Sequence, residues 1–313
     1  MAKRGRSGAR NTTRAVAGVV EVPKGTSPDG PVEGVYYIDT GDCELIADQD
    51  NSNGWLLKIN GVMSSHIDVA DPLFLDFEYM RWMAALIESR WPPSGSAGSR
   101  PKGADPARLR GLHLGGGACS LARYFHAAYP DARQVVVELD GKLAGYVRGW
   151  FDLPKAPLLR IRVGEAREVT ETLTAGTRDF IIRDVFAGAL TPRPLTTAEF
   201  TNHARQVLAP GGMYVVNSGD APDLKNARED AATIAASFEH TVIIADPAML
   251  KGRRYGNMVM AGSDAPFDHD PQLARRLLGG AVPAHLWNDA QVRAFAAGSP
   301  VRHDPHPAPS MAP

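Results

Sequence analysis

The sequence predicts an α/β protein in which a small antiparallel β-domain precedes a mostly parallel sheet of seven strands, the last one antiparallel. Three observations predict this class. Short apolar segments separated by turn residues fill 35–67. From residue 109 onward apolar strands alternate with helical segments, which is typical of a parallel sheet covered on both faces. Only the nine residues 247–255 separate the final two strands, too few for a helical crossover.

Four short strands are predicted in the N-terminal part, at 35–39, 43–48, 55–60 and 62–67. Asn60-Gly61 lies between two apolar runs and is a strong hairpin signal, so these strands should form an antiparallel sheet. A helix should follow from about Asp71 to Glu88. Asp71 can cap this helix, and Pro72 suits its first position.

Seven strands are predicted after the next linker, at 111–115, 134–139, 158–163, 179–184, 211–217, 241–246 and 256–262. Helical segments fill most of the gaps. A sheet of seven strands with a reversed last strand is typical of the methyltransferase-type Rossmann sheet and differs from the dehydrogenase type. One or two short helices should follow, at 271–279 and 288–297.

These elements divide the chain into six parts. Segments rich in Gly, Ser, Pro and Arg, without hydrophobic periodicity, predict disorder or a linker. The expected parts are a disordered tail at 1–30, the β-domain at 31–70, a helix and linker at 71–107, a Rossmann-like nucleoside-binding domain at 108–264, C-terminal helices at 265–298 and a disordered tail at 299–313.

The composition restricts the class of protein. The 313 residues are 44% hydrophobic and carry a net charge of −1, so nothing attracts the whole chain to nucleic acid or to a membrane. No apolar run has the length that spans a bilayer, and no apolar segment follows the first six residues, so no secretory signal is predicted. Two cysteines, Cys43 and Cys119, cannot form a disulfide framework. We therefore expect a protein of the reducing cytoplasm.

A glycine turn and an acidic residue predict a nucleoside site. Gly115, Gly116 and Gly117 follow the first strand of the sheet, and glycine lets the backbone turn sharply and approach a ligand. The next helix offers unpaired N–H groups and a positive dipole end. Glu138 ends the following strand, where a carboxylate can reach the ribose hydroxyls of a bound nucleotide. Either feature alone is often a turn without a ligand, but together they favour the site.

The ligand of this site could be a dinucleotide or an S-adenosyl compound. The glycine segment half-matches the dinucleotide pattern, with Ser120 in the last glycine position. Glu165 comes just after the third strand, where an acid can meet an adenine amine. A Pro-Gly-Gly turn before the fifth strand and the reversed last strand point the same way. We therefore expect an S-adenosyl nucleoside.

Asp184 is the predicted catalytic residue. It lies at the carboxyl end of the buried fourth strand, the edge at which open parallel sheets bind ligands. A carboxylate there can orient an ammonium group and accept its proton, because an amine with a pKa of about 10 is mostly protonated at neutral pH. The alternative is an aspartate that caps the turn before Pro192. Asp179, at the other end of the strand, should be structural.

From about residue 35 to 264 the chain resembles the spermidine synthase family of aminopropyltransferases. The similarity rests on the segments LGGGA, VVELD, VGEAR, IIRDVFAG and YGNMVMAGSDAP, in that order. The family joins an N-terminal β-domain to a methyltransferase-like Rossmann domain and transfers an aminopropyl group from decarboxylated S-adenosylmethionine to putrescine. The resemblance implies that decarboxylated S-adenosylmethionine or S-adenosylmethionine is the co-substrate, that a small amine is the acceptor, and that the protein is a homodimer of polyamine biosynthesis.

The family's functional residues match this chain in part. The resemblance makes Gly115, Gly116 and Gly117 the glycine turn, Glu138 the ribose-binding acid, Glu165 the acid near adenine and Asp184 the proton acceptor. The family's polar amine-binding positions are filled here by Ala118, Phe77, Met249 and Ser65, or Ser64 by another alignment. Ala118 replaces an aspartate and Phe77 a tyrosine. Tyr79 and Glu78 are the candidates on the same helix to replace that tyrosine.

Three other functions compete with aminopropyl transfer. A methyltransferase would need no anchor for an aminopropyl amine, which fits Ala118. A binding protein could keep the fold without catalysis, and a dehydrogenase is the most distant alternative. The nine histidines and two cysteines show no metal-ligand spacing, so we expect no metal. We also expect no nucleic-acid or membrane partner.

Overall fold

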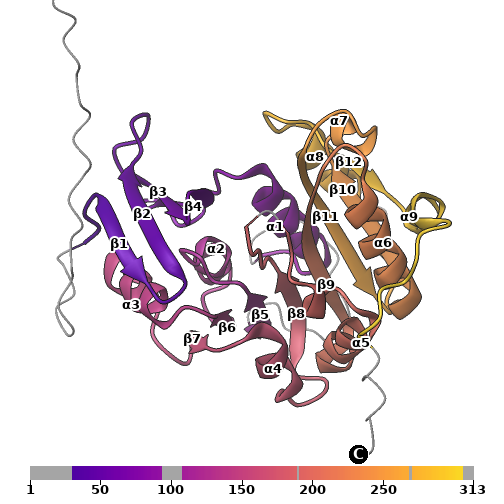
Figure 1. Cartoon of the computed structure of the whole chain (residues 1–313), viewed down its shortest axis with the longest axis horizontal. Coiled ribbons are helices and arrows are strands. Elements are labelled where there is room, and N and C mark those ends of the chain that lie inside the picture. Colours follow the sequence, from indigo (N-terminus) through magenta and orange to yellow (C-terminus); the bar gives the residue numbers. More distant parts are fainter. Residues whose placement is uncertain (1–29, 94–107, 189, 268–269, 306–313) are drawn as a thin grey trace, which may run out of the picture.

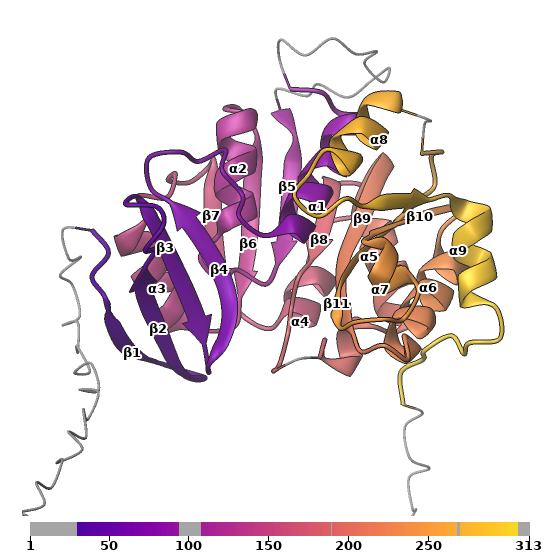
Figure 2. The same cartoon turned by 90° about the horizontal axis from the view of Figure 1, so that it is seen from above.

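The computed structural model describes residues 30–93, 108–188, 190–267 and 270–305, which form two β-sheets that lie side by side (Figures 1 and 2). Residues 1–29 and 306–313 of the two predicted tails, and residues 94–107 of the predicted linker, lie outside the described residues. Within those ranges no helix is long and apolar enough to cross a bilayer.

The smaller sheet contains four strands, β1 (Gly34–Ile38), β2 (Gly41–Ala47), β3 (Gly54–Ile59) and β4 (Val62–Asp68). All neighbouring pairs are antiparallel, as predicted. Asn60 and Gly61 have φ values of 50° and 78°. Positive φ at both central residues is what a two-residue hairpin turn of type I′ requires, so the predicted hairpin is confirmed.

The helix after this sheet begins later than we predicted. Helix α1 spans Glu78–Arg90, and its N-cap is Phe77. The Asp71 carboxylate accepts a hydrogen bond from the Leu73 N–H (2.9 Å), and the Asp71 carbonyl accepts one from the Phe74 N–H. Aspartate side chains form such local turns as readily as they cap helices. Asp71 therefore begins a turn, and the predicted start of the helix is wrong.

The larger sheet has the strand order β12-β10-β11-β9-β8-β5-β6-β7. Its strands are β5 (Arg110–Leu114), β6 (Arg133–Glu138), β7 (Leu159–Val163), β8 (Arg178–Arg183), β9 (Leu208–Asp220), β10 (His240–Ala245), β11 (Gly256–Ser263) and β12 (His285–Trp287). Strands β5 to β9 pair in parallel, and β11 runs antiparallel to both of its neighbours, as predicted. The eighth strand, β12, was not predicted because three residues carry no detectable alternation.

Helices cover both faces of this sheet. One face packs against α4 (Ala166–Glu171), α5 (Ala198–Val207), α6 (Lys225–Ser237) and α9 (Asp289–Ala296). The other face packs against α1, α2 (Ser120–Ala128) and α8 (Pro271–Leu278). Helix α3 (Gly141–Trp150) shares a core with the small sheet. The remaining elements with given bounds are the short α7 (Pro247–Leu250) and a 3₁₀ turn at Arg193–Leu195.

The two faces can be followed residue by residue along β8. Phe180 and Ile182 belong to the core under α1, whereas Ile181 belongs to the core under α6. Successive side chains of a strand point to opposite faces of its sheet. By this alternation Arg183 faces α6 and Asp184 faces α1.

The predicted C-terminal tail is wrong for 299–305. Arg302 is only 9% exposed, its carbonyl accepts a hydrogen bond from the Ala198 N–H (2.8 Å), and its N–H donates to Thr233 Oγ1 (3.1 Å). Histidine and proline in this segment suggested a solvated end, but buried ion pairs fix it on the domain.

Candidate functional site

The glycine turn joins the ends of three neighbouring strands. The Gly115 N–H donates to the Val137 carbonyl (3.0 Å) on β6, and the Asp184 N–H donates to the Leu114 carbonyl (2.9 Å) on β5. Gly115 has a φ of +91°, and a Cβ built on it would lie 2.2 Å from the Asp184 carbonyl oxygen. A side chain is therefore excluded both by the backbone conformation and by the neighbouring strand end.

Glu138 touches the glycine turn directly. Its Oε2 accepts hydrogen bonds from the N–H groups of Gly116 (2.9 Å) and Gly117 (3.2 Å), and its Oε1 accepts one from the Asp140 N–H (2.9 Å). Burial raises the pKa of Glu138, and these three N–H donors work against that rise. The two features that predicted a nucleoside site are thus one hydrogen-bonded unit at the carboxyl ends of β5 and β6.

Asp184 lies just past the end of β8, and two side chains from other elements hold its carboxylate. The Tyr79 hydroxyl on α1 donates to Oδ2 (3.0 Å), and Nδ2 of Asn217 on β9 donates to Oδ1 (2.9 Å). Among the described residues, the hydrogen bonds of the Asp184 carboxylate are to these two side chains and not to the turn before Pro192. Asp184 stands between the glycine turn and β9, on the face that α1 covers.

The electrostatics of this cluster make the Asp184 carboxylate a proton acceptor and keep the neighbouring Tyr79 hydroxyl a hydrogen-bond donor. Burial raises the pKa of Asp184, while the hydrogen bonds from Asn217 and Tyr79 and the charge of Arg183 lower it. Burial, followed by the Asp184 charge, raises the pKa of Tyr79 well above its ordinary value. The hydroxyl therefore stays protonated and donates, so the carboxylate is the group that can accept a proton.

Asn217 was missed by the sequence analysis. It is 2% exposed, and among the described residues its Oδ1 has no hydrogen-bond partner. Its place near the carboxyl end of a buried strand, next to the strand of Asp184, was the available signal. An unpaired buried acceptor beside a carboxylate is suited to an N–H donor of a ligand.

Glu165 stands apart from this cluster. It is the N-cap of α4, and its Oε2 accepts a hydrogen bond from the Glu168 N–H (2.9 Å). The preceding Gly164 N–H donates to the Glu138 carbonyl (2.9 Å), which places Glu165 beside the end of β6. The carboxylate is half-buried and occupied by the cap.

Strand β4 of the small sheet rests on the residues that follow the glycine turn. The Ala118 N–H donates to Ser65 Oγ (3.0 Å), and Ser120 Oγ donates to the His66 carbonyl (2.9 Å). Ala118 is 1% exposed and belongs to the apolar core shared with the small sheet. Position 118 is therefore packed, and Ser65 is used to hold the turn.

The other departures from the family pattern are also explained by packing. The Phe77 ring stacks against the ring of Tyr79, with centroids 5.9 Å apart, and the hydroxyl that reaches Asp184 from α1 is that of Tyr79. Met249 is fully buried in the core under α6. Of the two candidates on α1, the structure brings Tyr79 to the acid.

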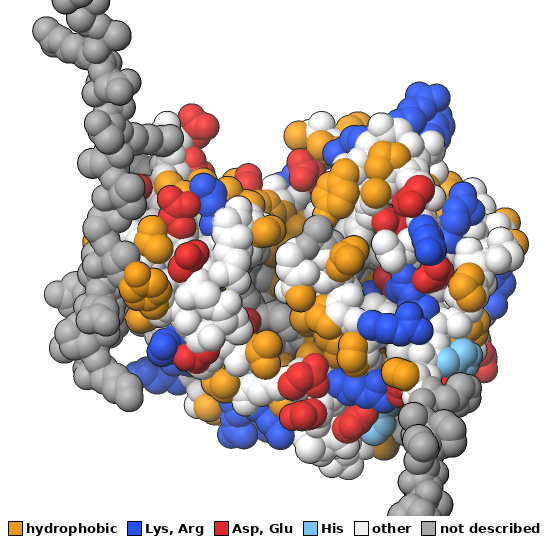
Figure 3. Space-filling model, viewed as in Figure 1, with side chains coloured by type: hydrophobic (Ala, Val, Ile, Leu, Met, Phe, Trp, Pro, Cys, Tyr) orange, Lys and Arg blue, Asp and Glu red, His pale blue; other side chains and the backbone are white. Residues whose placement is uncertain are grey.

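The small sheet and α1 both contact the candidate site, through Ser65 on β4 at Ala118 and through Tyr79 on α1 at Asp184. Figure 3 shows the surface hollowed between the small sheet and the part that carries α1 and β11. Among the described residues no three His, Cys, Asp or Glu side chains form a group that could hold a metal ion.

Curated relatives match part of the chain. A polyamine aminopropyltransferase of Chromobacterium violaceum is 28% identical over 184 residues, which are 56% of this chain and 62% of the relative. One of Neisseria meningitidis serogroup A is 28% identical over 165 residues, 51% of this chain and 58% of the relative. The match thus spans less than two thirds of these relatives. No protein-family model matches the chain.

Solved structures match over most of the chain. A probable spermidine synthase from Corynebacterium glutamicum is 47% identical, with a TM-score of 0.83, over 90% of this chain and all of that one. A spermidine synthase in complex with the transition state analogue AdoDATO (16% identical, TM-score 0.53, 85% and 84% covered) shows the fold alone. So does human methyltransferase-like protein 13 in complex with SAH (17% identical, TM-score 0.50, 73% and 96% covered). These likenesses confirm the predicted fold class.

Proposed function

Because the chain belongs to the spermidine synthase family, we propose that it transfers an aminopropyl group from decarboxylated S-adenosylmethionine to a small amine. The observation that carries this proposal is the acid cluster of Asp184, Tyr79 and Asn217. It lies at the strand end next to the glycine turn that Glu138 closes. The same proposal includes a small amine as the acceptor, assembly of the protein as a homodimer, and a location in the cytoplasm.

The nucleoside is proposed to bind across the ends of β5, β6 and β7. The Glu138 carboxylate would accept hydrogen bonds from the ribose hydroxyls, and the side-chain-free turn at 115–117 would let the nucleoside lie close to the backbone. Glu165 would approach the adenine amine from the start of α4. The sulfonium would then point toward Asp184, because the turn touches the strand end of that residue.

The acid cluster is proposed to prepare the nucleophile. The acceptor arrives as an ammonium ion, donates one N–H to the Asp184 carboxylate and another to Asn217 Oδ1. Asp184 takes the proton, and the freed nitrogen lone pair attacks the carbon beside the sulfonium. A C–N bond forms and a C–S bond breaks, with its electron pair neutralising the sulfur. Alignment of the two reactants supplies the rest of the acceleration.

The test separates aminopropyl transfer from methyl transfer. Isothermal calorimetry with decarboxylated S-adenosylmethionine should give binding, and putrescine added to that complex should yield spermidine by mass spectrometry. The buried Ala118, which offers no anchor to an aminopropyl amine, motivates methyl transfer as the second candidate. Binding of S-adenosylmethionine but not of its decarboxylated form would exclude aminopropyl transfer. Nucleoside binding with no turnover of any diamine would favour a binding protein.

Replacing Tyr79 by Phe is expected to lower kcat about tenfold. The change removes the hydroxyl that donates to Asp184 Oδ2, so the pKa of Asp184 should rise further. Because the carboxylate is the active form, the acid limb of the kcat profile should move to higher pH. Rates measured between pH 5 and 9 test this, with the exposed Tyr37→Phe as control. An unshifted acid limb would contradict the assignment.

A further inference from the structure

The C-terminal residues 298–305, here called the strap, cross the helices that cover the back of the sheet. The strap runs from the end of α9 past α6 to α5 and α4 (yellow in Figure 1). The Asp304 carboxylate accepts two hydrogen bonds from the Arg167 guanidinium of α4 (2.7 and 2.6 Å). His303 Nδ1 lies 2.9 Å from Glu199 Oε1 of α5. Each contact joins the strap to a different helix.

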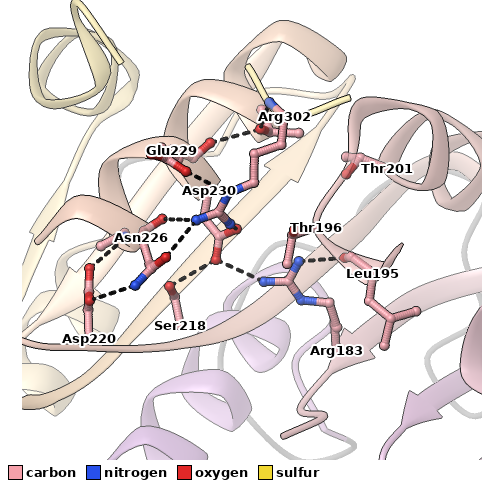
Figure 4. A network of polar contacts seen from close by, with 12 residues as sticks. Arg183, Leu195, Thr196, Thr201, Ser218, Asp220, Asn226, Glu229, Asp230 and Arg302 are labelled. Carbon is pink, nitrogen blue, oxygen red and sulfur yellow. Dashed lines mark hydrogen bonds and ion pairs between the residues drawn. The ribbon is translucent and has the colours of Figure 1, made fainter. Parts of the chain in front are cut away.

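Arg302 is the part of the strap that enters the core. Its Nε donates to Glu229 Oε2 (2.9 Å) and its Nη1 to Asp230 Oδ1 (2.6 Å), both on α6. The other carboxylate oxygen of Asp230 accepts from Arg183 Nη2 (3.0 Å) and from Ser218 Oγ (2.9 Å). Figure 4 shows the two guanidinium groups meeting at Asp230 from opposite sides. Asp230 and Arg183 are 3% and 2% exposed, so little water screens the pair.

This buried cluster is directly behind the proposed acid site. Arg183 is the last residue of β8 and immediately precedes Asp184, and Ser218 immediately follows Asn217 on β9. Side chains alternate along a strand, so each pair points to opposite faces of the sheet. The same two strand ends therefore hold the charged cluster under α6 and the Asp184–Asn217 contact under α1.

We propose that Arg302 is a positioning residue, which holds Asp230 and Arg183 so that the ends of β8 and β9 present Asp184 and Asn217 in register for transfer. The inference rests on the proposed function for its kinetic consequences, but its structural content does not. Arg302 touches no reacting atom, and it acts through Asp230, Arg183 and the two strand ends.

The charge balance of the cluster predicts the direction in which each substitution should shift the pKa of Asp184. Two arginines face two carboxylates, those of Asp230 and Glu229. Removing the charge of Arg302 leaves Asp230 with Arg183 as its ion-pair partner and takes from Glu229 the arginine with which it pairs, and buried charges without partners are costly. Arg183 lowers the pKa of Asp184, and the remaining groups that face this carboxylate are Tyr79 from α1 and Asn217 from β9. A more negative cluster should therefore raise the pKa of Asp184, and a more positive one should lower it.

Two variants of opposite charge test this inference in the full chain. Arg302→Gln should lower kcat about tenfold, change KM less than twofold and move the acid limb of kcat up by about half a pH unit. Glu229→Gln should move the same limb down, and Arg302→Lys should recover at least half of the lost kcat. Arg205→Gln, which removes an exposed ion pair with Asp264, is the matched control.

A second measurement needs no substrate. Hydrogen exchange at the backbone amides of 183–186 and 216–220 should be about tenfold faster in Arg302→Gln than in the wild type or in Arg205→Gln. If the wild type transfers no aminopropyl group, the proposed function fails while the exchange result still decides the inference. A folded Arg302→Gln with wild-type exchange there overturns it. The inference is also overturned if the acid limb of kcat moves in the same direction in Arg302→Gln and in Glu229→Gln. If Arg302→Gln does not fold, two other measurements decide the inference. They are the shift of the acid limb of kcat in Glu229→Gln and the amide hydrogen exchange of Arg302→Lys at the same residues.

Discussion

Replacing Asp184 by Asn is expected to lower kcat by about a thousandfold while leaving the protein folded and able to bind the nucleoside. Asparagine keeps the size of the side chain and can still contact Tyr79 and Asn217, but it cannot accept a proton from an ammonium ion. The glycine turn and Glu138 are untouched, so calorimetry with decarboxylated S-adenosylmethionine should give an affinity close to that of the wild type. Turnover is measured with putrescine over the whole pH range.

The same substitution should not reduce stability at neutral pH. Burial raises the pKa of Asp184 above its ordinary value, so in the window between those two pKa values the folded state binds more protons than the unfolded state. The free energy of unfolding then falls as pH rises through that window. Asparagine does not ionise and removes this fall, so the melting temperature at pH 7 should equal or exceed that of the wild type.

Asp179→Asn is the matched control at the other end of β8. Asp179 accepts hydrogen bonds from the Arg110 N–H (2.7 Å) and from its guanidinium, far from the acid cluster. This variant should lose about 1 kcal/mol of stability and keep nearly all of its kcat. A catalytic role for Asp184 would be refuted by an Asp184→Asn enzyme with more than a tenth of the wild-type kcat.

Replacing Gly115 by Ala is expected to destabilise the protein by about 3 kcal/mol and to abolish most nucleoside binding. The new methyl group would lie 2.2 Å from the Asp184 carbonyl oxygen, at a φ of +91° that side chains rarely adopt. The obstacle is backbone and cannot rotate away, so the ends of β5 and β8 must separate. Thermal unfolding and calorimetry with the nucleoside measure the two effects.

Gly145→Ala provides the control for this change. Gly145 lies in α3, where an added Cβ meets nothing within 4 Å, and alanine stabilises helices relative to glycine by about 0.5–1 kcal/mol. The control should bind the nucleoside as the wild type does. A Gly115→Ala protein with wild-type stability would show that the strand ends can move apart, and the close packing inferred at this turn would then be wrong.

The sequence by itself determined the fold class and the backbone of the proposed nucleoside site. Apolar strands alternating with helical segments predicted a parallel sheet, and the short connection before the last strand predicted its reversal. Gly115–Gly117 and Glu138 were found together, because adjacent parallel strands end at one edge of the sheet and local spacing then places an acid beside a turn. The place of Asp184 at the same edge of the sheet was predicted for the same reason.

Only the tertiary structure decided which side chains complete the acid cluster and which charged side chains lie behind it. Tyr79 reaches Asp184 from a helix whose start the sequence misplaced, because an Asx turn and a helix cap have the same local pattern. Asn217 and Arg302 lie far from Asp184 along the chain, and no periodicity relates residues brought together by chain crossings. Their contacts follow from burial, since a charge or an amide enclosed by protein must find its partners among whichever elements the fold packs around it.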